Sequence, residues 1–94
     1  MMDTLEGSLL KVEHASAHED PRGVSLSHEV ITRAQELSVP EVEVRARLAL
    51  AWTLMEQKPT EAHEHVRMAT YLAEAIGHPG LQARAHCLAA RMAV

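Results

Sequence analysis

Four prolines, spaced almost evenly along the chain, constrain its fold more than any other sequence feature. They are Pro21, Pro40, Pro59 and Pro79. Proline is tolerated in the first turn of an α-helix, where its missing N–H would have had no partner, and it breaks a helix farther along. Each proline therefore predicts a helix start, and the spacing predicts helices of about four turns with short connections.

The stretch from Val42 to Met55 is predicted to be the central helix. It has no charged residue between Arg47 and Glu56. Two apolar stripes run along it at helical spacing. One stripe is Val42, Ala46, Ala49, Leu50 and Thr53, and the other is Val44, Leu48, Ala51, Trp52 and Met55. Because a helix that is apolar nearly all round packs on several sides, we expect this helix to be surrounded by the others.

Composition predicts the fold class. The apolar residues are mostly Ala and Leu, which are good helix formers, and the chain has no Phe. Ninety-four residues suit one domain, so we expect residues 1–94 to form a single all-α domain of four or five antiparallel helices. The net charge of −4 argues against nucleic acid as a partner. No apolar run is long enough to span a membrane, and we expect a cytoplasmic protein without membrane contact.

The remaining helices are predicted from their apolar faces. The first covers residues 3–17, the second begins near Ser25 or Ser27, and Gly77 ends the fourth as a C-terminal cap. The expected buried faces are Leu5, Leu9, Leu10, Val12 and Ser16 in the first helix; Leu26, Val30, Ile31, Ala34 and Leu37 in the second; Ala62, Val66, Ala69, Leu72, Ala73 and Ile76 in the fourth; and Leu81, Ala85, Leu88, Ala89 and Met92 in the last.

The start of the central helix carries two local signals. Ser38 and Glu41 have the spacing of a capping box, in which each side chain accepts a hydrogen bond from the other residue's backbone N–H. Glu41 precedes Arg45, and Glu43 precedes Arg47, at the spacing that places both partners on one helix face. These pairs predict two ion pairs within the helix.

The chain contains an internal repeat. Placing Ser38-Val39-Pro40 on Gly77-His78-Pro79 also places apolar residues on apolar residues, such as Val42 on Leu81. A period of this length is typical of stacked two-helix units, each of which cannot bury its own apolar face. The alternative is chance similarity between amphipathic helices.

These positions make residues 26–94 resemble the tetratricopeptide-repeat superfamily. The family's alternation of small and bulky residues falls on Ala46, Ala49, Leu50 and Thr53 in the first helix of a repeat, on Ala62, Val66 and Ala69 in its second helix, on Pro79 after it, and on Ala85, Leu88, Ala89 and Met92 in the next unit. The period is longer than the family's standard of about 34 residues. Long, Ala-rich repeats of this kind are similar to those in the regulatory regions of bacterial signalling proteins, including diguanylate cyclases and transcriptional activators.

The resemblance implies a non-catalytic domain for protein–protein interaction or self-association. It places the groove of the repeat at Arg47, Ala51, Met55, His86 and Ala90. The partner would be a protein or peptide lying on apolar surface rimmed by Arg and Glu.

Several side chains allow two interpretations. Arg45, Arg47, Arg84 and Arg91 either face a shared groove that grips an acidic peptide or form exposed pairs on the helix surface. Trp52 and Met55 are expected in the core, with an apolar anchor for a partner as the alternative. Cys87 is expected to be a small buried hydrophobe rather than a reactive thiol.

The last helix has an apolar stripe that the sequence leaves uncovered. Cys87, Ala90 and Val94 lie along it, and no stop signal follows Arg84. An uncovered apolar face associates, so we expect the chain to be an N-terminal fragment of a longer protein, or a homo-oligomer, or both.

Chemical motifs for catalysis are missing from the sequence. It has no Gly-rich phosphate loop and no Gly-x-Ser-x-Gly elbow, so we expect neither an enzyme nor a bound cofactor. Its seven histidines include pairs such as His14 with His18 and His63 with His65. They lack the third ligand of a zinc motif, and solvated faces explain them without a metal. A helical domain that senses a small molecule or a metal through these histidines remains the alternative function.

Overall fold

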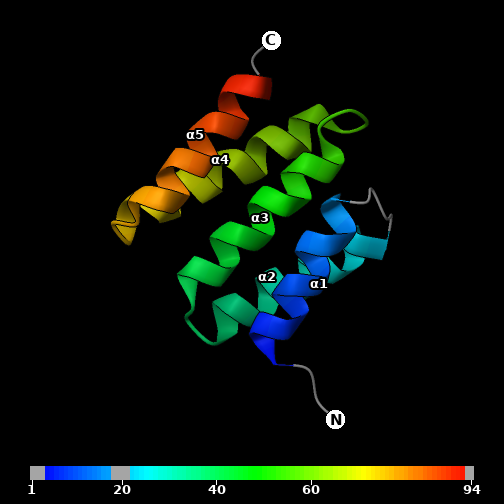
Figure 1. Ribbon diagram of the computed structural model, residues 1–94, viewed down its shortest axis with the longest axis vertical. Coiled ribbons are helices and arrows are strands. Elements are labelled where there is room, and N and C mark those ends of the chain that lie inside the picture. The colour runs from blue at the N-terminus through cyan, green and yellow to red at the C-terminus, as the bar shows by residue number, and fades with distance from the viewer. Residues whose placement is uncertain (1–3, 18–21, 93–94) are drawn as a thin grey trace.

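Five α-helices make up the described part of the chain. The computed structural model describes the backbone of residues 4–17 and 22–92, and the side chains of residues 4–14 and 22–92. The helices are α1 (Leu5–Ala17), α2 (Arg22–Glu36), α3 (Pro40–Leu54), α4 (Pro59–Ala75) and α5 (Pro79–Met92). The described residues contain no strand. The predicted all-α class with antiparallel neighbouring helices is therefore confirmed (Figure 1).

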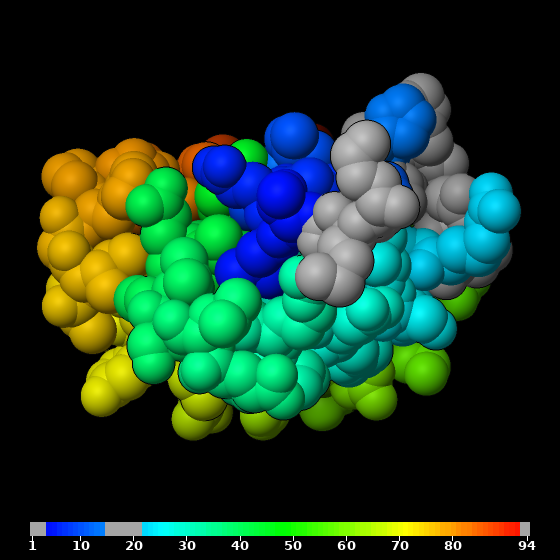
Figure 2. All heavy atoms as spheres, turned by 90° about the horizontal axis from the view of Figure 1, so that it is seen from below, coloured from blue at the N-terminus to red at the C-terminus, as the bar shows by residue number. Residues whose placement is uncertain are grey.

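The helices form two layers. Helices α1, α3 and α5 lie toward the viewer in Figure 1, and α2 and α4 lie behind them. The view from below in Figure 2 agrees, because it shows α1 (blue) and α5 (orange to red) along one side and the yellow spheres of α4 along the other. Each helix contacts its neighbour in sequence, and α3 also contacts α1 and α5. The shortest extent of the molecule, 18 Å, fits two layers of helices.

Helix α3 is the centre of the packing, as its apolar pattern predicts. It contacts all four other helices. Its buried apolar residues point in several directions around the helix: Val42, Val44, Ala46, Leu48, Leu50, Ala51 and Leu54. Ala46 and Ala51 are fully buried, and their small side chains let the neighbouring helices approach closely.

Three of the four prolines begin helices as predicted. Pro40, Pro59 and Pro79 are the first residues of α3, α4 and α5. Pro21 lies outside the described residues, and α2 begins at Arg22. The predicted start of α2 at Ser25 or Ser27 is wrong, because the first turn already lies against the core, where Gly23 is buried and Val24 packs on the core residues. The Gly23 carbonyl also accepts a hydrogen bond from the Ser27 hydroxyl one turn later, and the helix forms there despite the low helix propensity of glycine.

The predicted capping box at Ser38 and Glu41 is also wrong. Ser38 has a positive φ of 55° and forms the end of α2 instead of the cap of α3. Its N–H donates to the Gln35 carbonyl over 3.2 Å, and the Val39 N–H donates to the Ala34 carbonyl over 2.9 Å. This is the Schellman arrangement, which satisfies the last carbonyl groups of a helix. Val39 then precedes α3 without a side-chain cap.

The same turn recurs at Gly77, the residue that the internal repeat aligns with Ser38. Gly77 has a φ of 63°, and its N–H donates to the Glu74 carbonyl over 3.1 Å. The His78 N–H donates to the Ala73 carbonyl over 3.1 Å. Gly77 is thus the predicted cap of α4, and the two turns correspond in conformation and hydrogen bonding. The α3–α4 connection differs, since Met55 ends α3 in the right-handed region.

In the helices other than α3, most residues of the predicted apolar faces are buried, but three large ones are exposed. They are Leu10, Leu37 and Ile76. Leu37 and Ile76 come after the last residues of α2 and α4, where the chain turns away from the core, so helical periodicity no longer applies to them. Ser16, the last member of the predicted α1 face, lies outside the residues whose side chains are described. None of the helices, over the residues described, combines the length and apolarity that crossing a bilayer requires.

Candidate functional site

A groove lies between α1 and α5 over the surface of α3. It forms because α1 and α5 both pack on α3 while, over the described residues, their backbones do not approach each other. Its volume is about 510 Å³, within the range of known binding clefts. Its lining consists of Glu13 from α1; Leu48, Ala49 and Trp52 from α3; and Arg84, Cys87, Leu88 and Arg91 from α5. We call this the α1–α5 groove.

Trp52 is the largest apolar side chain in the groove, and it corrects one expectation. The sequence favours a core position, but Trp52 is 38% exposed. It lies one helical turn after Leu48 on the face of α3 that neither α1 nor α5 covers completely. Leu48 and Leu88 are nearly buried beneath the same opening, so the base of the groove is apolar.

Arg91 and Arg84 form the polar side of the groove on α5. The guanidinium carbon of Arg91 lies 4.9 Å from the centre of the Trp52 ring, a distance at which the ring face attracts a cation. Arg84 lies two helical turns earlier, and 54% of its side chain is exposed. Both cations are therefore held beside apolar surface while their charged groups remain accessible to solvent.

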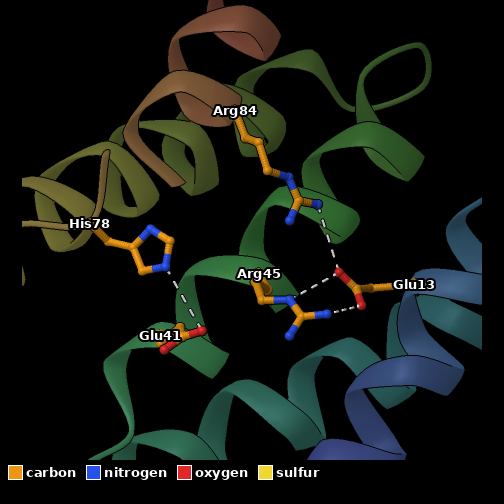
Figure 3. A network of polar contacts seen from close by, with 5 residues as sticks. All are labelled: Glu13, Glu41, Arg45, His78 and Arg84. Carbon is orange, nitrogen blue, oxygen red and sulfur yellow. Dashed lines mark hydrogen bonds and ion pairs between the residues drawn. The ribbon is translucent and has the colours of Figure 1, made fainter. Parts of the chain in front are cut away.

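An ion-pair network joins the three helices at the groove (Figure 3). Arg45 donates to the two Glu13 carboxylate oxygens, with its Nη2 2.6 Å from Oε1 and its Nε 3.3 Å from Oε2. The Arg84 Nη2 lies 3.7 Å from the Glu13 Oε2. One carboxylate from α1 thus faces two guanidinium groups from α3 and α5. Together with Arg91, the groove carries more positive than negative charge although the whole chain has a net charge of −4.

Figure 3 also shows a second contact between α3 and the α4–α5 turn. His78 accepts a hydrogen bond at Nδ1 from the Leu81 N–H over 3.1 Å, which caps α5. Its Nε2 lies 4.0 Å from the Glu41 Oε1. Glu41 is therefore near His78 rather than near Ser38, and Arg45 contacts Glu13 rather than its predicted partner Glu41.

Arg47 lies outside the α1–α5 groove, in a polar cluster where α2, α3 and α4 meet. Its Nε donates to the Glu43 Oε2 over 2.7 Å, which confirms the predicted pair of Glu43 and Arg47. Glu43 is buried and also accepts from the Gln35 Nε2 over 3.3 Å. The Arg47 Nη1 lies 3.0 Å from the Nδ1 of His65. The buried Glu43 carboxylate thus has a donor from α2 and one from α3, and Arg47 links it to His65 of α4. Removing one of these partners would leave a buried charge uncompensated.

The surroundings of His65 in this cluster favour its neutral imidazole. Burial lowers the pKa of His65 below its ordinary value of 6.5, and the neighbouring charges of Arg47 and His28 lower it further. Glu61 and Glu64 act in the opposite direction. The His28 ring lies edge-on to it, with centres 6.0 Å apart. The neutral imidazole can accept a hydrogen bond from Arg47, whereas the protonated ring would repel it.

The structure brings together only part of the predicted partner-binding set. Trp52, Arg84 and Cys87 line the groove. Cys87 is exposed, so the expectation of a buried thiol is wrong; the residues of α5 that face the core are Leu81, Ala85 and Leu88. Three other predicted positions do not line it: Met55 is half-buried against the core, and His86 and Ala90 are exposed on α5. Val94 lies outside the described residues.

Glu13 is the groove residue that sequence reasoning missed. It lies in the first helix, far along the chain from both Arg45 and Arg84, and no local pattern connects these positions. Leu48 and Leu88 were assigned to buried faces, and their partial access to the groove follows only from the packing of α5.

Neither a cluster of metal ligands in the described residues nor a comparison with known proteins adds a role for the groove. Among residues 4–14 and 22–92, no three His, Cys, Asp or Glu side chains come together as metal ligands would. Comparisons with models of protein families, with curated proteins and with solved structures found no match.

Proposed function

We propose that this chain is a non-catalytic protein–protein interaction domain that binds a partner segment in the α1–α5 groove. The observation that supports this proposal is the exposed Trp52 above an apolar base, beside two accessible arginines. Tryptophan and arginine are the residue types that most often dominate binding energy at protein interfaces. The groove lining contains no histidine, so it does not favour the alternative of a domain that senses a metal through its histidines.

The biological setting is part of the same proposal. The resemblance to long-period tetratricopeptide units favours a regulatory or signalling protein of bacteria. The free thiol of Cys87 is exposed, which fits a reducing compartment such as the cytoplasm.

Selection from a displayed library of random peptides tests the proposal. Selected peptides should change the fluorescence of Trp52, which is the only tryptophan of the chain and lies in the groove. The Cys87→Glu substitution places a charge in the groove at an exposed position and should abolish binding. The matched control is Ala75→Glu, because Ala75 is exposed on α4 in the other layer. Peptides that bind both variants equally, or no selected peptides at all, would contradict the proposal.

Self-association is a second candidate function. Ala83, Cys87 and Ala90 are exposed at helical spacing on α5, and a second copy of the chain could cover them. Sedimentation should then show dimers or larger species that Ala90→Glu weakens and Ala75→Glu does not. A monomer at high concentration would exclude this function without affecting binding in the groove.

A further inference from the structure

The charge of the α1–α5 groove differs in sign from the charge of the whole chain. Arg84, Arg91 and Arg45 contribute three positive charges at or beside the groove, and Glu13 contributes one negative charge. Arg45 makes two hydrogen bonds to Glu13 and leaves Arg84 only a longer contact of 3.7 Å. Arg84 and Arg91 are therefore the two cations that the described groove lining offers to a ligand, although the chain as a whole has a net negative charge.

The apolar base of the groove restricts the backbone of the ligand. Leu48, Ala49, Trp52 and Leu88 offer almost no hydrogen-bonding groups, and the walls are helices rather than a sheet edge. An extended peptide would have to bury backbone N–H and C=O groups there without partners, which is unfavourable. An α-helix satisfies its own backbone groups and can place one apolar face on this surface.

The two arginines set the spacing of the ligand's charges. Arg84 and Arg91 are seven positions apart on α5, which is two turns or about 10 Å along the helix axis. A second helix lying along α5 has the same rise per residue. Acidic residues seven positions apart on its surface would therefore face both arginines, with the apolar stripe of the ligand helix directed toward Trp52.

We infer that the partner segment is an acidic amphipathic helix whose two carboxylates, seven positions apart, pair with Arg84 and Arg91. This inference depends on the proposed function and specifies its ligand. The carboxylate near Arg84 takes the position that Glu13 now approaches from α1, so Glu13 competes with the ligand for that cation (Figure 3). The second carboxylate contacts Arg91 where it lies over the Trp52 ring.

A focused helix library tests this inference. The displayed peptides are about five turns long, roughly 18 residues, with a fixed apolar stripe and two randomised positions seven apart. Selection on the protein should enrich Asp and Glu at both positions. Arg84→Gln and Arg91→Gln should each weaken binding of the enriched peptide about three-fold, as expected for partly exposed ion pairs. Arg67→Gln, which removes an exposed arginine of α4, is the charge-matched control and should leave the affinity unchanged.

Two further variants distinguish the ligand's charge and its conformation. Glu13→Gln should strengthen binding of the acidic helix, whereas a purely structural role for Glu13 predicts weaker binding. A proline in the middle of the peptide should abolish binding because it breaks the helix.

Several results would overturn the inference. Enrichment of neutral or basic residues, equal loss of affinity in Arg67→Gln, or preference for a short single-stranded oligonucleotide would each contradict an acidic helix. Peptides that bind without acidic residues but are lost in Cys87→Glu would overturn the inference and leave the proposed function intact. Failure to obtain any peptide that depends on the groove would instead overturn the proposed function.

Discussion

Replacing Ser38 with glycine is expected to stabilise this protein. Ser38 holds a φ of 55°, which costs an L-residue about 1–2 kcal/mol relative to glycine. Glycine also gives the unfolded chain more freedom, which reduces the gain by about 0.4–1 kcal/mol. The net increase in the free energy of unfolding is therefore about 1 kcal/mol, equivalent to a rise in Tm of about 5 °C for a domain of this size.

Urea and thermal unfolding followed by circular dichroism measure this effect, and two variants serve as controls. Ser38→Ala keeps the backbone cost and removes the hydroxyl, so its stability should be close to that of the wild type. Gly77→Ala is the reciprocal change at the equivalent turn. Nothing lies within 4 Å of a Cβ added at Gly77, so its φ of 63° alone should lower stability, by about 1 kcal/mol.

The reasoning is refuted if Ser38→Ala lowers the stability by about 1 kcal/mol while Ser38→Gly fails to raise it. That result would mean that the hydroxyl caps α3, as the capping-box pattern predicts. The two turns lie in different helix connections and share no hydrogen bond, so the effects of Ser38→Gly and Gly77→Ala should add in the double variant.

Three other predictions concern the packing around α3. Arg47→Ala should lower the free energy of unfolding by about 3 kcal/mol, because it leaves the buried Glu43 carboxylate without its main partner. Arg84 is exposed, so Arg84→Ala should lower it by less than about 1 kcal/mol. Urea unfolding of both variants tests this difference. His65 has a lowered pKa in the folded protein, so the unfolded chain binds the proton more tightly and stability is lost as the pH falls below 6.5. Between pH 7.5 and 5.5 the urea midpoint should therefore fall less in His65→Gln than in the wild type, and an equal fall would contradict the assignment. Leu50→Ala should cost about 3 kcal/mol because Leu50 is fully buried, while Trp52→Ala should cost clearly less in thermal unfolding and should abolish peptide binding.

Local sequence patterns predicted most of the secondary structure. Proline can occupy only the first turn of a helix, so Pro40, Pro59 and Pro79 marked helix starts without knowledge of the fold. Glycine is the residue that best adopts a positive φ, so Gly77 marked a helix end. Ser38 also ends a helix with a positive φ, but the sequence does not show this, since serine is more typical of the N-terminal cap of a helix. The internal repeat contained the information needed to resolve it, because it aligned Ser38 with Gly77.

Only one of the two ion pairs predicted within α3 forms. Glu43 and Arg47 pair as expected from their spacing. Arg45 has the same spacing from Glu41 but binds Glu13 of α1, because α1 packs directly against this face of α3. Glu13 accepts two hydrogen bonds from Arg45 in a partly buried position, which is a stronger interaction than an exposed pair with Glu41. No local sequence pattern reveals that Glu13 lies there.

The sequence by itself therefore determined the all-α class, the central position of α3 and three of the helix starts, because these depend on periodicity and on the stereochemistry of single residues. Only the tertiary structure decided that Trp52 and Cys87 are exposed and that Arg47 lies away from the groove. Exposure depends on which neighbour covers a face, and an apolar stripe has the same pattern whether it meets another helix or an open groove. The α1–α5 groove exists because two helices pack on α3 without packing on each other, and that arrangement depends on contacts between segments that lie far apart in the sequence.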